Sequence, residues 1–367
     1  MKIGVDIKAL RHPQAGIGRY ITQLLDAIQK TDLKNEFILF SPVPINYLIK
    51  NPRWKIIICP GKIKLPGILW QQLVLPYFVK KENIDVFWGP EQTTFLLPIS
   101  KVKKITTIYD FVYKRYAKTM RWSVRHIQKW FGEKSLFSSD RLVCISDFTA
   151  KEMQFFYPQI PPSKTGIVSC GYFAEETSSP LSEREPFLLF AGSLEPRKNL
   201  IKLIQALELL HEKGIDVPLY LTGPSGWKNL ALNSILKNSP IKKSIIHLGY
   251  VSNKELKDLY RRCRALIFPS LYEGFGLPVL EALAFNTPVL TSSHSVMQEI
   301  AGPCAIYFDP KSKKSIAQAI ENFWFSKALS TFTEEQEKVR MQILNKYTWE
   351  NAALEMLNQI LLSKRAK

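Results

Sequence analysis

Two glutamates, Glu273 and Glu281, stand eight positions apart in the otherwise apolar stretch LYEGFGLPVLEALAFNTPV, residues 271–289. Two glycines and a proline separate them, so one continuous helix through both carboxylates is excluded. We expect a loop over 271–277, followed by a helix with Pro278 at its first position and Glu281 in its first turn. A carboxylate pair could hydrolyse a glycoside, but nothing else in the chain resembles a saccharide cleft, whereas much resembles a phosphate site.

The expected loop follows a strand, and open α/β sheets bind ligands in the crevice beyond the carboxyl ends of their strands. Glu273 would lie in that crevice. The backbone N–H groups of Gly274, Phe275, Gly276 and Leu277 would be free to donate to the ligand. The alternative is a loop glutamate followed by a glutamate that interacts with a helix dipole, with no ligand involved.

A phosphate site is indicated by FAGSLEPRKNL, residues 190–200. Gly192 follows a predicted strand, and Arg197 and Lys198 stand where the loop meets the next helix. Two adjacent cations there can neutralise a diphosphate, the arginine as a fork and the lysine as a point charge. The alternative is an ordinary surface loop that carries an Arg-Lys pair.

A second glycine-bearing turn is expected before the helix of HPQAGIGRYITQLLDAI, residues 12–28. Gly16 and Gly18 would let the backbone approach an anionic ligand. The turn is not a dinucleotide-binding fingerprint, because Ile21 replaces the third glycine and no acid follows about 20 residues later. By itself this motif is weak support for a phosphate site.

The chain has no Asp-x-Asp motif and no phosphate-loop lysine motif, and its five histidines are dispersed. A reaction that expels a diphosphate would therefore depend on Arg197, Lys198 and helix N-termini, and we expect no metal and no other cofactor.

Short β-branched runs alternate with amphipathic helical patterns, which predicts an α/β fold of two doubly wound, Rossmann-like domains. The polar segment 174–186 separates two series of strands and is expected to be the hinge. The last helix is expected over 348–367. The strands are expected at 2–7, 36–40, 55–59, 85–89, 104–110, 141–146 and 165–170, then at 187–192, 218–223, 245–249, 265–270, 288–293 and 305–309.

Length and composition agree with two domains, since 367 residues exceed one ordinary domain and 46% of them are hydrophobic. Five scattered cysteines without CxxC spacing indicate reduced thiols and a cytoplasmic protein. The N-terminus, MKIGVDIKAL, is typical of a first strand and not of a signal peptide. The apolar run 65–79 is too short to span a bilayer.

The net charge of +18 is concentrated in the first half. Residues 1–180 hold 26 basic and 14 acidic side chains (+12), and the remainder holds 24 and 18 (+6). A strongly basic N-terminal half suggests an anionic partner, which could be nucleic acid, a lipid surface or a phosphorylated ligand.

A basic region, 114–134, contains TMRWSVRHIQKWF, in which cationic and apolar residues both recur at helical spacing. A basic, tryptophan-bearing amphipathic helix suits an anionic membrane, and the protein would then be peripheral at the inner face of the membrane. An ordinary helix with its apolar face in the domain core is the equal alternative. The cations are Arg121, Arg125 and Lys129, the apolar stripe is Met120, Val124, Ile127 and Phe131, and Trp122 and Trp130 flank it.

The stretch SLYEGFGLPVLEALAFNTPV, preceded by GSLEPRKNL and LGYVSNKELKDLYRRCRALIFPS, resembles the retaining, metal-independent glycosyltransferases of family 4, also called group 1. The resemblance extends from GIGRY to the YTWENAA helix. It implies the GT-B fold, with an acceptor-binding domain over 1–174 completed by the C-terminal helix 349–367, and a nucleotide-sugar-binding domain over 185–345.

The resemblance also implies roles for single residues. Glu273 would lie beside the donor sugar, and Glu281 would hold the ribose hydroxyls of the nucleotide. Arg197 and Lys198 match the diphosphate clamp, in the loop that Gly192 opens. Phe275, Gly276 and Leu277, next to Gly274, match backbone donors to the sugar and phosphate. Gly16, near Gly18, matches the N-terminal loop glycine at the donor phosphates, and Leu248 and Tyr250 lie in the segment that holds the base.

Two positions depart from the family pattern. Tyr109-Asp110 stands where many relatives have His-Asp, so Asp110 remains a candidate catalytic residue, and Tyr109 can hydrogen-bond a sugar but cannot serve as a cation. Asn286 stands where glycine is usual, and we expect it to tolerate a left-handed helix end.

The resemblance implies a retaining transfer of a hexose from a nucleotide-diphosphate sugar to a glycan or lipid-linked acceptor, in surface polysaccharide or lipopolysaccharide synthesis. GDP-mannose is the first expectation for the donor, and UDP-hexoses are the next. A basic nucleic-acid-binding protein is the alternative from another class, although we expect no nucleic-acid partner. A GT-B-fold sugar-nucleotide epimerase is the third hypothesis.

Overall fold

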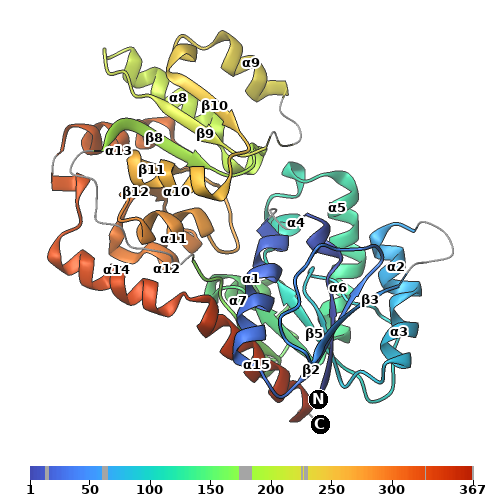
Figure 1. Ribbon diagram of the computed structural model, residues 1–367. Helices are drawn as coiled ribbons and strands as arrows, with labels where there is room; N and C mark the ends of the chain where they lie inside the picture. Colours follow the sequence, from blue (N-terminus) through green and yellow to red (C-terminus); the bar gives the residue numbers. More distant parts are fainter. Residues whose placement is uncertain are drawn as a thin grey trace. The chain divides into compact units, whose positions relative to one another are not determined.

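The computed structural model describes residues 1–12, 16–59, 65–172, 184–224, 226, 230–326 and 328–365 (Figure 1). The chain divides into two units. The first comprises Met1–Gly171 and Trp349–Lys367, and the second comprises Tyr172–Thr348. Of the expected hinge 174–186, residues 174–183 lie outside the described residues, and Glu185 and Pro186 belong to the first strand of the second unit.

The first unit is built on a seven-stranded parallel sheet in the order β3-β2-β1-β4-β5-β6-β7. Its strand order reverses between β1 and β4, so β2 and β3 extend to one side and β5 to β7 to the other. The strands are β1 (Lys2–Asp6), β2 (Glu36–Ser41), β3 (Trp54–Ile58), β4 (Val86–Gly89), β5 (Lys103–Ile108), β6 (Arg141–Cys144) and β7 (Thr165–Ile167).

Helices cover both faces of this sheet (Figure 1). On one face α1 (Gly16–Thr31) packs against the last helix, α15 (Trp349–Arg365), and the rings of Tyr20 and Trp349 meet edge to face at 5.9 Å. On the other face, apolar side chains of β2 and β4 pack against α2 (Gly67–Leu73) and α3 (Leu75–Lys81). The remaining helices of this unit are α4 (Val112–Arg115), α5 (Trp122–Ile127), α6 (Glu133–Ser138) and α7 (Asp147–Phe156).

The second unit repeats this architecture on a six-stranded parallel sheet in the order β10-β9-β8-β11-β12-β13, which reverses between β8 and β11. The strands are β8 (Glu185–Ala191), β9 (Leu219–Thr222), β10 (Ile245–Gly249), β11 (Cys263–Phe268), β12 (Val289–Ser292) and β13 (Ala305–Phe308). The helices are α8 (Leu200–His211), α9 (Leu230–Asn238), α10 (Asn253–Arg262), α11 (Leu277–Ala284), α12 (Val296–Ala301), α13 (Lys313–Phe325) and α14 (Glu334–Lys346).

Each of the predicted strands forms, because runs of β-branched and aromatic residues favour strands, and those of the central strands are buried on both faces as parallel sheets require. The predicted α/β fold of two Rossmann-like units is therefore confirmed.

The helix expected in 119–131 forms, but it begins at Trp122 and contains a π turn. Arg121 precedes α5 as its N-cap, and a π-helical turn, Gln128–Gly132, joins α5 to α6. A π turn holds one residue more than an α turn, so it shifts the helical phase of the residues that follow. Gly132 is buried in this turn, where a Cβ atom would lie 2.7 Å from the side-chain oxygen of Gln128.

Gly223, directly after β9, cannot carry a side chain. Its φ is +125°, and a Cβ atom would lie 2.2 Å from the carbonyl oxygen of Gly192, in the loop that leaves β8. Its N–H donates to the carbonyl of Gly249 at 2.7 Å. Three neighbouring strands, β8, β9 and β10, are therefore in backbone contact at their carboxyl ends.

We predict that Gly223→Ala lowers the free energy of unfolding by roughly 3 kcal/mol or more, because backbone must move in addition to the strain at positive φ. Gly214→Ala is the matched control: its φ is +79°, but no atom lies within 4 Å of the added Cβ. It should lose only about 1 kcal/mol. Urea unfolding compares the two variants, and equal losses would contradict the assigned backbone contact.

Candidate functional site

The predicted phosphate and carboxylate motifs meet at one place, where the strand order of the second sheet reverses. Arg197 and Lys198 follow β8, and Glu273 follows β11, the neighbouring strand. In parallel sheets the crevice at such a switch point is the usual ligand site. Residues 75 positions apart along the chain are thereby brought into direct contact.

The loop after β8 positions the two cations. A short 3₁₀ turn, Pro196–Lys198, is followed by Asn199, whose left-handed conformation (φ 63°) starts α8. The side-chain amide of Asn199 donates to the carbonyls of Pro269 at 3.1 Å and Pro310 at 2.7 Å. These bonds tie the loop after β8 to the loops after β11 and β13.

Glu273 accepts from both cations. Its Oε2 lies 2.6 Å from Nη1 of Arg197, and its Oε1 lies 2.7 Å from Nζ of Lys198. All three side chains are largely buried, with exposed fractions of 10–15%. The guanidinium also donates to the carbonyl of Tyr272 at 2.5 Å, and the ammonium group of Lys198 lies 4.9 Å from the centre of the Phe268 ring.

This pairing determines the charge of Glu273. Burial alone would raise the pKa of its carboxyl group, but the adjacent charges of Arg197 and Lys198 outweigh burial and lower the pKa to about 2. The carboxylate is therefore ionised at every physiological pH. Both cations are already engaged by it, so a bound diphosphate has to share them with Glu273.

The loop that follows Glu273 offers backbone donors. Gly276 has a φ of +129° and precedes α11, and a Cβ atom there would lie 2.7 Å from the sulfur of Met297. Among the described residues, no acceptor is found for the N–H groups of Phe275, Gly276 or Leu277. Phe275 itself is buried and packs edge to face on Tyr347 at 5.4 Å. The loop conformation therefore leaves these three donors at a helix N-terminus.

Glu281 is not in the first turn of its helix. Since α11 begins at Leu277, one residue earlier than expected, Glu281 lies beyond that turn and is buried. Its Oε2 accepts a hydrogen bond of 2.9 Å from the hydroxyl of Tyr260 on α10. Asn286, after the end of this helix, has a φ of +56°, which confirms the expected left-handed conformation.

The segment expected to hold the base lies on an edge strand. Leu248 belongs to β10, and the pairing with β9 shifts register between His247 and Gly249. An extra residue at such a bulge is left out of the ladder. Leu248 and Tyr250 are exposed, by 39% and 54%. The remaining glycine of the set, Gly192, has a φ of +147° and donates to the carbonyl of Thr222.

Three predicted residues belong to the first unit. Gly16 and Gly18 lie inside the first turn of α1 and not in a turn before it, which corrects the prediction. Residues 13–15, which precede them, lie outside the described residues. Helix N–H groups of this turn still lack intrahelical acceptors. Asp110 follows β5, and its Oδ1 accepts from the N–H of Val112 at 3.0 Å.

Three residues that help to shape this site were not predicted from the sequence. Glu195 lies 3.6 Å from the guanidinium of Arg197, and its other oxygen accepts from the hydroxyl of Ser193. As described above, Asn199 holds the loop after β8, and Tyr260 donates a hydrogen bond to Glu281. Asn199 could have been found, because asparagine before a helix is a common N-cap. The other two carry no signal in their spacing.

In the described part of the chain, no group of three or more His, Cys, Asp and Glu side chains is arranged to hold a metal ion. No described helix is both long and apolar enough to cross a membrane.

Family comparisons cover both units. The model described as "Glycosyl transferases group 1" matches residues 173–339, and the one described as "Glycosyltransferase Family 4" matches residues 15–176. The O-antigen chain mannosyltransferase B of Escherichia coli is 30% identical over 98% of this chain and 99% of its own length. The chain belongs to the group 1, or family 4, glycosyltransferases. It is therefore a glycosyltransferase, and its mannosyltransferase relatives place it among the hexosyltransferases.

Solved structures show the same fold over the full length. A sucrose-phosphate synthase from Thermosynechococcus elongatus superposes with a TM-score of 0.74 at 17% identity, covering 100% of both chains. WaaG, a glycosyltransferase involved in lipopolysaccharide biosynthesis, superposes with a TM-score of 0.70 at 14% identity, covering 99% of each. Both are GT-B glycosyltransferases, and the predicted fold class of this chain is confirmed.

The lowered pKa of Glu273 predicts how the stability of the folded protein depends on pH. Its folded-state pKa lies below its ordinary value of 4.5, so the pairing stabilises the folded protein by roughly 3 kcal/mol above about pH 5 and loses this contribution as the pH falls toward 2. We predict that Glu273→Gln destabilises the protein by that amount near neutral pH, and by progressively less in acid.

The matched control is Glu185→Gln, which removes a surface carboxylate 2.6 Å from Arg262 in the same unit. It should lose less than about 1 kcal/mol. Urea unfolding at several pH values measures both variants. A Glu273→Gln loss that stays constant between pH 5 and about 2 would contradict the assigned pairing.

Proposed function

We propose that this glycosyltransferase moves a hexose, with mannose as the first candidate, from a nucleotide-diphosphate sugar to a glycan or lipid-linked acceptor with retention of configuration. The observation that carries the proposal is the contact of Glu273 with Arg197 and Lys198 at the sheet switch point. The relatives support the substrate class, since several are mannosyltransferases of O-antigen synthesis. A structural neighbour, HepE of Anabaena, was solved with UDP-glucose.

Different residues of the second unit would bind different parts of the donor. Arg197 and Lys198 would donate to the diphosphate, and the free N–H groups of Phe275, Gly276 and Leu277 would add to the positive potential at the start of α11. Glu273, fixed as an anion, would accept from a sugar hydroxyl. Glu281 would hold the ribose in the same way.

Transfer of the hexose would then proceed without a covalent enzyme intermediate. The bond between the anomeric carbon and the phosphate oxygen breaks while the acceptor oxygen bonds to the same face of that carbon, and the acceptor proton passes to the departing phosphate. Negative charge grows on the diphosphate, which the two cations stabilise in place of a metal ion. Asp110, in the first unit, is kept as a candidate catalytic residue.

A thermal-shift panel of GDP-, UDP- and ADP-sugars, with and without EDTA, tests the donor site. We predict that one nucleotide class raises Tm, that EDTA does not change the effect, and that Lys198→Met abolishes it because the phosphate loses a cation. Lys213→Met is the matched control, since Lys213 forms a surface pair with Glu321 in the same unit. Loss of the shift in EDTA would overturn the metal-free clamp.

We further propose that the protein is cytoplasmic and docks on the inner face of an anionic membrane through α5 and the π turn that follows it. None of the residues of α5, all of which the structure describes, is buried, although Met120, just before the helix, packs against a core cluster of the first unit. Trp122 and Trp130 are 74% and 58% exposed. Large exposed aromatic side chains suit the boundary between headgroups and acyl chains.

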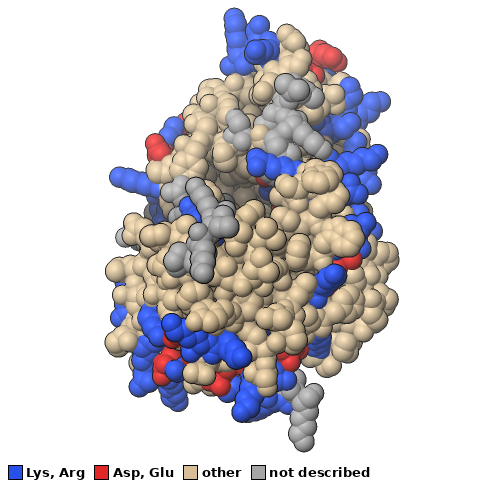
Figure 2. All heavy atoms as spheres, turned by 90° about the vertical axis from the view of Figure 1, so that its right-hand side faces the viewer, with Lys and Arg blue, Asp and Glu red and all other residues tan. Residues whose placement is uncertain are grey.

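The charge of the surface around α5 also favours an anionic membrane as the partner. Arg125, Lys129 and Lys134 are exposed, and none of them has an ion-pair partner among the described residues. On the same side of the unit, α2 and α3 expose Leu73 and Tyr77. Figure 2 looks onto this side and shows a broad area of uncharged side chains bordered by Lys and Arg. Exposed tryptophans beside cations such as Arg125 and Lys129 complement an anionic lipid surface.

Sedimentation with vesicles tests this docking. We predict binding to vesicles that contain an anionic lipid, weaker binding in high salt, and a loss of roughly tenfold or more when Trp122→Ser and Trp130→Ser are combined. Phe325→Ser is the control, because that side chain is 68% exposed but lies in the second unit. Unchanged binding of the double variant would refute the assigned surface.

A further inference from the structure

Two arginines from other elements bind the carboxyl end of α11, the helix whose start carries the proposed backbone donors to the diphosphate. Nη1 of Arg340, on α14, donates to the carbonyl of Leu283 at 2.7 Å. Nη2 of Arg184, the residue before β8, donates to the carbonyls of Phe285 at 3.3 Å and Asn286 at 2.8 Å. The last carbonyls of a helix lack regular intrahelical partners, so donors from outside the helix can anchor that end.

Helix α11 depends on its neighbours for its position. It comprises eight residues, Leu277–Ala284, and an isolated helix of that length is not stable in water. Its N-cap, Gly276, offers no side-chain acceptor, and its first turn holds no acidic residue. Residues 279–284 are all buried, so the helix is fixed by packing and by the polar contacts at its ends.

Arg340 is held in one orientation by its own partner. It is buried, and its Nε and Nη2 donate to the two carboxylate oxygens of Glu337, one turn earlier on α14, at 2.8 and 2.5 Å. A bidentate pair of this kind fixes the plane of the guanidinium. Hydrogen bonding to Arg340 also lowers the pKa of Glu337, so the pair stays ionised near neutral pH. The remaining nitrogen, Nη1, is directed at α11, on which α14 packs (Figure 1).

Arg184 joins the end of α11 to the end of α10. Its Nη1 donates to the carbonyls of Arg261 at 2.8 Å and Tyr260 at 3.1 Å, in the last turn of α10. The ring of Tyr260 stacks on that of Phe285, with centres 5.9 Å apart, and its hydroxyl donates to Glu281 at 2.9 Å. One guanidinium thus fixes the two helices that form the bond between Tyr260 and Glu281.

We propose that Arg184 and Arg340 are positioning residues for the nucleotide-sugar donor. They act through α11 and not by contact with the donor, because six residues of helix, or about 9 Å, separate Leu283 from Leu277. A shift of this short helix displaces Glu281 and the N–H groups of residues 275–277 together. Binding groups must be held close to their productive geometry, so the anchors at one end determine affinity at the other.

The charge of the two arginines acts in the same direction as their hydrogen bonds. The carboxyl end of a helix carries a partial negative charge, which two guanidinium groups offset. The positive potential at the start of α11 is then less opposed by its other end. The proposal rests on the proposed function, because it concerns the donor of that same reaction.

Isothermal titration calorimetry with GDP-mannose, UDP-glucose and ADP-glucose tests the proposal. The nucleotide sugar that binds the wild-type protein most tightly should bind Arg184→Met and Arg340→Met roughly tenfold or more weakly, because the helix is no longer held. Arg340→Lys should recover part of the affinity, since lysine keeps the charge and one donor but loses the bidentate pair. Affinities equal to that of the wild type in both methionine variants would overturn the proposal.

The matched control is Arg264→Met. Arg264 donates to the carbonyl of Trp324, near the end of α13 in the same unit, and stands at the start of β11, away from the loop that carries Glu273. Its loss should lower Tm, as the loss of Arg340 does, without changing donor affinity. Equal weakening of donor binding in Arg264→Met and Arg340→Met would show a general effect of lost stability and would refute a positioning role.

A milder variant keeps the test decisive if the methionine variants do not fold. Glu337→Gln leaves Arg340 in place and removes only its partly exposed carboxylate partner. We expect donor binding to weaken by about twofold to fivefold, because the guanidinium is no longer fixed in its plane. Donor affinity equal to that of the wild type in both Glu337→Gln and Arg340→Lys would overturn the proposal.

Amide hydrogen exchange shows whether the effect passes through α11. Peptides that cover 275–286 should exchange at least about tenfold faster in Arg340→Met than in Arg264→Met, because only the first variant frees the end of this helix. Equal exchange in the two variants would exclude α11 as the element through which the arginines act.

The titrations also distinguish this proposal from the proposed function. If the wild type binds no nucleotide sugar, the donor assignment fails, and the positioning role fails with it. If the wild type binds a nucleotide sugar and both arginine variants bind it equally well, the donor assignment stands and the positioning role alone fails.

Discussion

The ionised carboxylate of Glu273, buried between Arg197 and Lys198, holds together the loops that form the proposed donor site. A buried carboxylate is stable only when charges or donors compensate its lost hydration, and here both come from the neighbouring loop. The loops after β8 and β11 must therefore end at the same point. This requirement explains the left-handed Asn199, the positive φ of Gly276 and the close backbone contact of Gly223 with Gly192.

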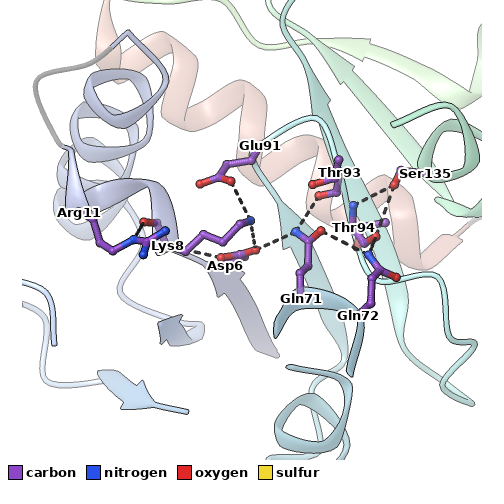
Figure 3. Close-up of polar contacts among 9 residues, drawn as sticks. All are labelled: Asp6, Lys8, Arg11, Gln71, Gln72, Glu91, Thr93, Thr94 and Ser135. Carbon is purple, nitrogen blue, oxygen red and sulfur yellow. Dashed lines mark hydrogen bonds and ion pairs between the residues drawn. The ribbon is translucent and has the colours of Figure 1, made fainter. Parts of the chain in front are cut away.

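The two sheets place charged side chains at the same topological position, where their strand order reverses. At the switch point of the second sheet, Arg197 and Lys198 face Glu273, and an anion bound there would share the two cations with the carboxylate. At the switch point of the first sheet, Lys8 lies between Asp6 and Glu91, and the charge of Arg11 also acts on Glu91 (Figure 3).

The sequence was sufficient for the fold and for the meeting of Arg197, Lys198 and Glu273 at one place. Parallel strands buried on both faces carry a strong local signal, and so do the clustered glycines and charges of 190–200 and 271–289. Other features depend on contacts between distant residues. Lys8 and Glu91 are in contact but are far apart along the chain, and Tyr109 appeared only as a departure from the family pattern. That its buried hydroxyl has no partner among the described residues becomes visible only in three dimensions.

Errors in the sequence analysis have local physical causes. The helix of the basic region contains a π turn, Gln128–Gly132, which hydrophobic periodicity does not detect. Gly16 and Gly18 were placed in a turn because glycine usually weakens helices, yet both lie in the first turn of α1. Helix α11 starts one residue early because Gly276, at positive φ, serves as its N-cap.

The proposed mechanism requires that the cation pair, held by Glu273, stabilises a departing diphosphate without a metal and with retention at the anomeric carbon. NMR of the product formed from GDP-α-mannose and a mannoside acceptor in excess EDTA measures both points at once. We predict an α-linked product that forms at the same rate with and without EDTA. A β-linked product, or a reaction that stops when divalent metal is removed, would refute this mechanism.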